Sequence, residues 1–199
     1  MSPAPEGRVV RRPENPRSRL QVEFYRRPTL DVARDLLGRV LCHRPATCRV
    51  LRGRITEVEA YDGPEDRASH AARGPTPRNR PMYEAGGIAY VYLIYGIHHC
   101  FNVVTGDAGY PAAILIRAAE SPRAELSARG PGRLTRAFAI DLERDGTTLV
   151  GDDLWLEAGE PVPARSVSRS ARIGVDYAEA WAKKPYRFLI AGHPDVSRR

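Results

Sequence analysis

Residues 54–61, with the sequence RITEVEAY, are rich in β-branched residues and predict a β-strand, in which successive side chains point to opposite faces. The Asp-Gly-Pro sequence that follows is typical of a turn. The alternation places Ile55, Glu57, Glu59 and Tyr61 on one face, so two carboxylates and an aromatic ring should emerge where the strand ends. The same pattern is also typical of glutamates that face solvent beside basic residues, and this stretch alone favours that second interpretation.

Other apolar segments predict a sheet of short strands. Residues 88–95, with the sequence IAYVYLIY, are rich in the aromatic and β-branched residues that favour strands, and Gly96 interrupts the run. Tyr90 and Tyr92 are expected on one face of this strand and Tyr95 on the other. Further strands are predicted at residues 40–43, 48–61, 99–105, 112–119, 154–157, 167–175 and 187–191.

Apolar spacing and capping residues predict a few short helices. The helix at residues 29–37 should begin with Thr29 as its N-cap and end at Gly38. Further helices are predicted at residues 122–129, 131–140 and 177–181. Single helical turns are expected at residues 66–70 and 79–84, in a region rich in Gly and Pro.

Many short strands with scattered helices, without internal repeats or a clear domain boundary, predict an α+β fold. We expect a single compact domain over residues 19–199, with a curved, mainly antiparallel sheet and short surrounding helices. Residues 1–18 are basic and rich in proline and lack the apolar core of a secretion signal, so they are predicted to be a disordered tail. No apolar run is long enough to cross a membrane.

The composition of the chain indicates the charge of its partner and the redox state of its compartment. The formal net charge of +7 favours a polyanionic partner. The three cysteines, Cys42, Cys48 and Cys100, form no CxxC pair. Their number and spacing fit a reducing cytosol and a role as small buried apolar residues better than a disulfide framework or a structural zinc site.

Arginine supplies almost all of the positive charge. Only Lys183 and Lys184 are lysines, so 31 basic residues minus 2 leaves 29 arginines. A GC-rich genome produces the same bias without a functional cause. The bias still has a chemical consequence, because no lysine amine precedes residue 183 to form a Schiff base.

Six sequence blocks, taken together, resemble the alkyladenine (3-methyladenine) DNA glycosylases, the monofunctional base-excision repair enzymes without a helix-hairpin-helix. They occur in the order found in that family across nearly the whole chain beyond the tail. No single block would be specific. The blocks are EVEAYDGPEDRASH (57–70), TPRNRPMY (76–83), YVYLIYGIHHCFNVV (90–104), AILIRAAE (113–120), GPGRLTRAFAI (130–140) and RIGVDYA (172–178).

The resemblance implies a catalytic role for two residues. Glu59 matches the general base that deprotonates a water for attack at C1′ of a damaged nucleotide, a role that suits a carboxylate held at a strand end. Arg117 matches the arginine that helps to place this water and contacts the nearby phosphate. A plain salt bridge from Arg117 to Glu59 is the structural alternative, and both could hold at once.

Four further residues match the base-binding pocket of the family. Tyr61 and Tyr92 would be the aromatic walls around the flipped base, where stacking and cation–π attraction favour a cationic alkylated purine. Without the resemblance, Tyr92 would be interpreted as a core residue. His70 would contact the base edge, and Asn102 would clash with the exocyclic amine of normal guanine, which would select against undamaged DNA.

Three residues match positions that contact the DNA around the lesion. Tyr95, just before Gly96, would be the wedge that fills the space left by the extruded nucleotide. Met82 and His98 would brace the separated strands. His98 departs from the tyrosine of eukaryotic relatives, which changes the chemistry of that bracing contact.

The resemblance therefore implies a monofunctional hydrolase that flips an alkylated or deaminated purine out of double-stranded DNA and leaves an abasic site. It further implies a monomer without a metal or cofactor, located in the bacterial cytoplasm at the nucleoid. The scarcity of lysine independently favours attack by water over an amine nucleophile.

Two other classes of function remain open from the sequence. One is a metal-dependent hydrolase or nuclease, although no HExxH or comparable ligand spacing occurs. Its candidate ligands would be Glu57, Glu59, Asp62, Glu65, Asp66 and His70, with His98 and His99 in addition. The other is a DNA-binding module that senses lesions without catalysis.

Overall fold

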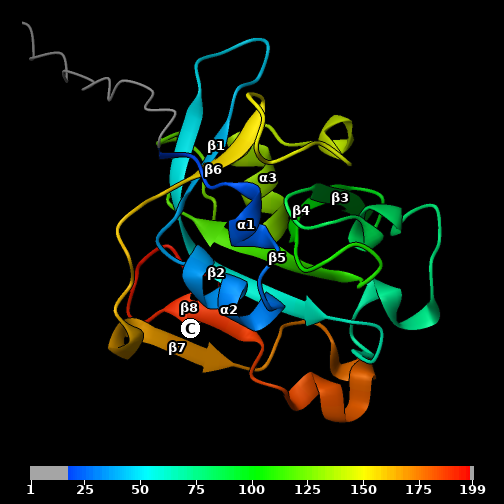
Figure 1. The fold of residues 1–199 in the computed structure, drawn as a ribbon. Helices are drawn as coiled ribbons and strands as arrows, with labels where there is room; N and C mark the ends of the chain where they lie inside the picture. Colours follow the sequence, from blue (N-terminus) through cyan, green and yellow to red (C-terminus); the bar gives the residue numbers. More distant parts are fainter. Residues whose placement is uncertain (1–17, 198–199) are drawn as a thin grey trace, which may run out of the picture.

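The fold is organised around one long strand, β2 (Leu51–Asp62), in the computed structural model, which describes residues 18–197 (Figure 1). The other strands are β1 (Val40–His43), β3 (Ala89–Ile94), β4 (His98–Val104), β5 (Ala112–Ala119), β6 (Leu154–Glu157), β7 (Val167–Ser170) and β8 (Arg187–Ile190). Their order is β3-β4-β5-β2-β1-β6, and β8 pairs with both β2 and β7. All of these pairings are antiparallel, which confirms the predicted α+β fold with a curved antiparallel sheet.

The helices are short and lie around the sheet (Figure 1). The α-helices are α1 (Val22–Tyr25), α2 (Thr29–Leu36) and α3 (Pro131–Phe138). The 3-10 segments are η2 (His70–Arg73), η3 (Arg80–Tyr83), η4 (Leu142–Arg144), η5 (Ala164–Ser166) and η6 (Asp176–Lys183). Figure 1 shows the end of β2, the loop that follows it and the orange segment η6 gathered on one side of the molecule. No helix among residues 18–197 has the length and apolar character needed to cross a membrane.

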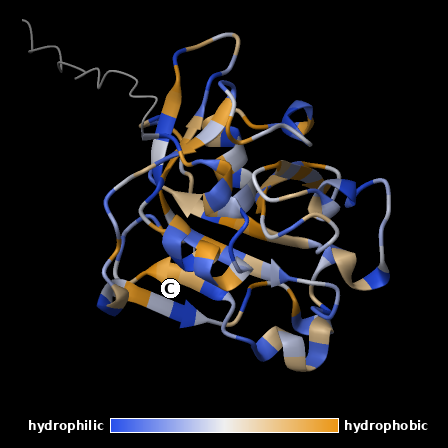
Figure 2. Ribbon diagram, in the orientation of Figure 1, coloured by the Kyte–Doolittle hydropathy of each residue, from blue (hydrophilic) through white to orange (hydrophobic). Residues whose placement is uncertain are grey.

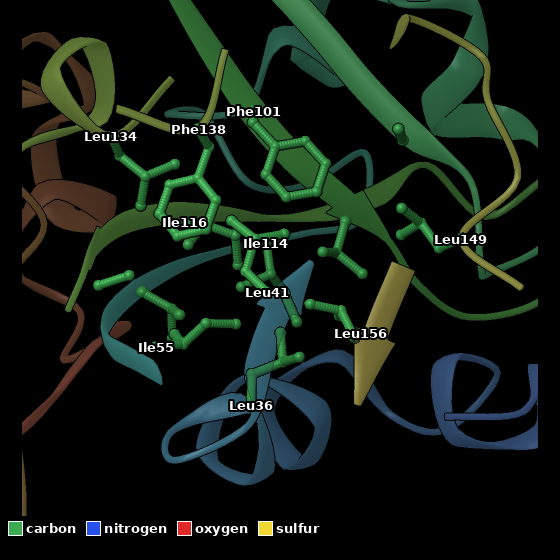
Figure 3. Close-up of a cluster of buried hydrophobic side chains, with 14 of the residues drawn as sticks. Leu36, Leu41, Ile55, Phe101, Ile114, Ile116, Leu134, Phe138, Leu149 and Leu156 are labelled. Atoms are coloured by element: carbon green, nitrogen blue, oxygen red, sulfur yellow. The ribbon is translucent and has the colours of Figure 1, made fainter. Parts of the chain in front are cut away.

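The main core lies where α2 and α3 pack their apolar faces on the sheet. Side chains from these helices and from β1, β2, β4, β5 and β6 point toward one another in Figure 3. Figure 2 shows the same distribution, with hydrophobic residues on the central strands and hydrophilic residues along the loops. Burial of each large aliphatic side chain stabilises the fold by about 1.5–3 kcal/mol, so this cluster holds β2 rigidly in place.

The alternation along β2 is interrupted, and the predicted position of Ile55 is therefore wrong. Register shifts occur between Ile55 and Glu57 and again between Glu57 and Val58, where β2 pairs with β5. Ile55 lies in the main core with Val58 and Ala60, not on the face of Glu59. An irregular pairing of this kind changes the face to which a side chain points, so strict alternation fails across it.

The helix predicted at residues 122–129 is absent. The chain there returns along the edge of β5, with an isolated bridge between Ala118 and Arg129. Gly130 N–H donates to the Arg117 carbonyl at 2.9 Å. These hydrogen bonds to a strand edge replace the intrahelical bonds that a helix would have formed.

Several smaller predictions also need correction. Thr29 is the first residue of α2 and not its cap, because Pro28 occupies the N-cap position and the Thr29 hydroxyl accepts from Thr105 at 3.2 Å. The turn expected at residues 66–70 begins as a 3-10 segment only at His70, and β7 ends at Ser170. Cys48 is exposed, whereas the other two cysteines are buried as expected.

The predicted N-terminal tail lies outside the described residues except for Ser18. The carbonyl of Ser18 accepts a hydrogen bond from Ala158 N–H at 2.5 Å.

Candidate active site

Glu59 lies on β2 at the point where this strand is flanked on both edges. It is opposite Leu115 of β5 on one side and Arg187 of β8 on the other. Its side chain is fully buried, which excludes the solvent-facing interpretation. A strand paired on both edges holds this carboxylate rigidly.

Three donors hold the Glu59 carboxylate. Tyr61 O–H donates to Oε2 at 3.1 Å and Arg117 Nη1 donates to the same oxygen at 3.2 Å. The backbone N–H of Ile173 donates to Oε1 at 2.7 Å. Both oxygens of the buried group therefore have partners, as a buried carboxylate requires.

Opposing effects set the protonation of Glu59. Burial raises its pKa above the ordinary value, whereas the positive charge of Arg117 and the hydrogen bonds from Ile173 and Tyr61 act in the opposite direction. The neighbouring carboxylate of Glu57 adds to the increase. The net effect is a raised pKa, which makes Glu59 a stronger proton acceptor than an exposed glutamate once it is ionised.

Arg117 joins two buried carboxylates. Its Nε donates to Glu57 Oε1 at 3.1 Å, while its Nη1 binds Glu59. Arg187 Nε also donates to Glu57 Oε1, at 2.7 Å. Burial by itself would lower the pKa of Arg117, but Glu59 and Glu57 raise it, so the guanidinium stays charged. The salt bridge expected between Arg117 and Glu59 is present.

A cavity of about 240 Å³ lies beside the residues that hold Glu59, although Glu59 does not itself line it. It falls below the range of about 300–1,000 Å³ that drug-sized ligands occupy, so it suits one small flat ring system. All three donors to Glu59, namely Tyr61, Arg117 and Ile173, line this cavity. The carboxylate itself is one residue layer behind the wall.

Aromatic side chains from β3 and the start of η2 form one side of the cavity. The His70 and Tyr92 rings meet edge to face with centroids 4.6 Å apart, and His70 Nδ1 is 2.9 Å from the Tyr90 hydroxyl. Burial and the nearby Arg78 lower the pKa of His70, so its neutral form is favoured. The Arg78 guanidinium lies 5.0 Å from the Tyr92 ring centroid.

Asn102 of β4 lies deeper in the same cavity and is held by the backbone. Its Nδ2 donates to the Tyr90 carbonyl at 3.0 Å and to the Cys100 carbonyl at 3.4 Å. Because both bonds use the amide nitrogen, the orientation of the side chain is fixed by the β3–β4 pair.

Tyr95 stands at the tip of the β3–β4 hairpin and is 87% exposed. Ile97 N–H donates to the Ile94 carbonyl at 3.2 Å, and the two residues between them, Tyr95 and Gly96, have φ values of 53° and 68°. Two positive φ values in succession are typical of tight hairpin turns, and glycine is well suited to one of them. The turn presents Tyr95 at the rim of the cavity, beside exposed Ile97.

Met82 and His98 lie in different environments. His98 is exposed at the start of β4. Met82 is only 2% exposed and packs with Tyr90, Val104 and Ala113 in the cavity wall. The expected bracing role of Met82 is therefore not supported, because a buried side chain in this position does not reach a DNA surface.

Sequence reasoning missed two residues of the site. Ile173 contributes a backbone N–H, which no side-chain motif encodes. Tyr177 of η6 lines the cavity, is 70% exposed, and donates from its hydroxyl to the Ala68 carbonyl at 3.2 Å. Its place in the block RIGVDYA was the only signal available.

The ligand set proposed for a metal-dependent hydrolase is not assembled. Within residues 18–197, no three His, Cys, Asp or Glu side chains are grouped so that they could hold a metal ion. Glu57 and Glu59 instead use their oxygens on arginines and on hydroxyl and backbone donors.

The sequence matches the model of the family described as "Methylpurine-DNA glycosylase (MPG)" over residues 23–194. A "Putative 3-methyladenine DNA glycosylase" of Anaeromyxobacter sp. (strain Fw109-5) is 52% identical over 182 residues, which cover 90% of this chain and 93% of that protein. One with the same name from Myxococcus xanthus is 47% identical, with the same coverage. The "DNA-3-methyladenine glycosylase" of Mus musculus is 42% identical over 93% of this chain and 63% of the mouse protein.

Proposed function

The chain belongs to the methylpurine-DNA glycosylase family and is thus a DNA glycosylase that hydrolyses N-glycosyl bonds, and from this premise we propose how its own residues act. The substrate is an alkylated or deaminated purine in double-stranded DNA. The base enters the aromatic cavity by flipping out of the duplex, because the target atom is inaccessible inside the stack.

The observation that carries this proposal is the arrangement of Glu59 behind the cavity. Each group that donates a hydrogen bond to its carboxylate also lines the space in which a base would sit. Glu59, the proposed proton acceptor, therefore lies behind the part of the cavity wall against which the sugar of a flipped nucleotide would rest. General-base catalysis requires a water within hydrogen-bond reach of this carboxylate, so the proposal requires that the attacking water enters between Tyr61 and Arg117 when a nucleotide is bound.

The proposed reaction is a displacement at C1′. Glu59 accepts a proton from water, the water oxygen forms a bond to C1′, and the bond from C1′ to the purine nitrogen breaks. An alkylated cationic purine leaves as a neutral base, whereas a neutral deaminated purine leaves as an anion that takes up a proton from solvent. In both cases the product is an intact abasic site. Arg117, with its charge preserved by two carboxylates, stabilises the ionised form of Glu59 and contacts the negatively charged backbone.

The cavity walls explain selectivity in this scheme. Tyr61 and Tyr92 offer ring faces on which a purine stacks, and a cationic base gains cation–π attraction. His70, favoured in its neutral form, and Asn102, with its amide fixed, meet the base edges. Tyr95 fills the space in the duplex, and exposed His98 contacts a flanking strand.

The experiment that tests this function uses duplexes that each contain one modified base. Free base is measured by chromatography with 3-methyladenine, 7-methylguanine, hypoxanthine and ethenoadenine as targets, and with an undamaged duplex as the control. The proposal predicts release of at least one modified base, no strand cleavage, and unchanged release after addition of a chelator. Absence of release from every duplex would refute it, and loss of release with the chelator would favour a metal-dependent reaction.

A further inference from the structure

Asp66 and Arg172 form a fully buried ion pair beside the cavity. Arg172 Nη1 lies 2.5 Å from Asp66 Oδ2, and Nη2 lies 2.8 Å from Oδ1, so the contact is bidentate. Neither side chain is exposed. A buried pair is weak evidence for stability, because desolvation offsets much of the attraction. The role of the Asp66–Arg172 pair must therefore follow from the residues that it contacts.

Arg172 connects the end of β2 with the segment that contains η6. Its Nη1 donates to the Ala60 carbonyl at 2.8 Å, and its Nη2 donates to the Trp181 carbonyl at 3.2 Å. The guanidinium carbon lies 4.8 Å from the centroid of the Tyr61 ring. A planar guanidinium on a ring face restricts the tilt of that ring, which a flexible ammonium does less well.

Asp66 orders the loop that follows β2. Its Oδ2 accepts from the backbone N–H of Asp62 at 3.2 Å, and its Oδ1 accepts from that of Ala68 at 3.1 Å. Asp66 thereby closes the turn after the strand while it holds Arg172. One ion pair thus fixes two walls of the cavity relative to each other.

The pair is linked to Glu59 by two short routes. Arg172 stacks on Tyr61, whose hydroxyl donates to Glu59 Oε2, and it directly precedes Ile173, whose N–H donates to Oε1. We propose that Asp66 and Arg172 are positioning residues that fix the orientation of the Glu59 carboxylate through Tyr61 and Ile173. This inference rests on the proposed role of Glu59 as the general base.

The pKa of Glu59 should change if this positioning is lost. The ionisable groups around it are Glu57 and Tyr61 from β2, Arg117 from β5, Arg187 from β8, which pairs with Glu57, and Arg172 beyond Tyr61. The bonds from Tyr61 and Ile173 oppose the effect of burial on the pKa of Glu59. If these donors drift after the pair is broken, the pKa of Glu59 should rise further, although no group in contact with Glu59 has been replaced.

The test compares Arg172→Lys and Asp66→Asn with a matched control. Arg172→Lys keeps the charge but loses the planar fork, and Asp66→Asn keeps the shape but loses the charge. The control is Glu179→Gln, which breaks the exposed pair with Arg67 that joins the same two segments at the surface. Two quantities are measured in folded protein: the single-turnover rate of base release and the titration of Glu59 by NMR with isotope-labelled glutamate.

We expect both pair variants to lose at least about tenfold in single-turnover rate, as changes in supporting residues commonly do. The titration of Glu59 should move to higher pH in Arg172→Lys, which keeps the positive charge, and the control should match the wild type. An unchanged rate and titration in folded variants would overturn the proposal, as would equal effects in the control or a failure of both variants to fold. If the wild type releases no base at all, the proposed function fails, whereas the NMR comparison still judges the positioning role.

Discussion

The hydroxyl of Tyr61 donates a hydrogen bond to Glu59 Oε2 at 3.1 Å, from a position two residues further along the same strand. The ring of Tyr61 lines the cavity, whereas Glu59 is buried behind it. One tyrosine therefore connects the space for the base with the group proposed to activate water.

The pH–rate profile of the wild type should have an acidic limb, in which the rate falls as pH decreases, with a midpoint set by the pKa of Glu59. A general base works only when ionised, so the rate should rise as pH increases through the pKa of Glu59. Burial raises this pKa, so the midpoint should lie above that of an ordinary glutamate. Single-turnover rates measured across pH at constant ionic strength test this expectation. A rate that is flat through the acidic range would contradict it.

Tyr61→Phe should move this limb to still higher pH. The substitution keeps the ring and removes only the hydroxyl, whose hydrogen bond lowers the pKa of Glu59. At a pH well above the limb, the rate should lie closer to that of the wild type. The matched control is Tyr186→Phe, because this ring also lies near Arg172 but, among the described residues, Tyr186 is not one of the groups that hydrogen-bond to Glu59. Equal limbs in wild type and Tyr61→Phe would contradict the assignment.

Arg117→Gln should destabilise the protein strongly. The change leaves two buried carboxylates, those of Glu57 and Glu59, with one charged partner fewer, and such losses cost about 3–5 kcal/mol. Arg129→Gln breaks a partly exposed pair with Asp195 and should cost at most about 1 kcal/mol. Denaturant unfolding of both variants gives the comparison. Similar free energies of unfolding would show that the buried network contributes little.

Tyr95→Ala should weaken the binding of damaged duplex and spare plain duplex. The exposed ring is suited to replace the extruded nucleotide in the stack, whereas the arginines attract any DNA backbone. Dissociation constants for both duplexes at one fixed salt concentration test this, with Leu142→Ala as a control at another exposed apolar residue. Equal weakening for both duplexes would refute the wedge role.

The sequence predicted most strands because their apolar patterns are local. The bounds of β1, β5 and β6 agree with the prediction. The face of Ile55 could not be predicted, since the register shift depends on how β2 pairs with a strand more than fifty residues away. The missing helix at residues 122–129 has the same cause, because the edge of β5 offers hydrogen bonds that the local sequence does not reveal.

The candidate site was predicted in part. The side chains of Glu59, Tyr61 and Arg117 are recognisable by type and motif, and they meet in the structure. The contribution of Ile173 could not be predicted, because any residue could supply that backbone N–H. The buried state of Met82 depends on tertiary packing, and the surface role expected for this residue came only from the family resemblance.

The central claim is that the Glu59 carboxylate activates the attacking water. The most direct measurement compares single-turnover base release by wild type and Glu59→Gln on the duplex that the wild type processes fastest, with exposed Glu143→Gln as the control. The account predicts a loss of at least about 100-fold for Glu59→Gln with binding of the damaged duplex retained, and no loss for the control. Release by Glu59→Gln at the rate of the wild type would contradict it.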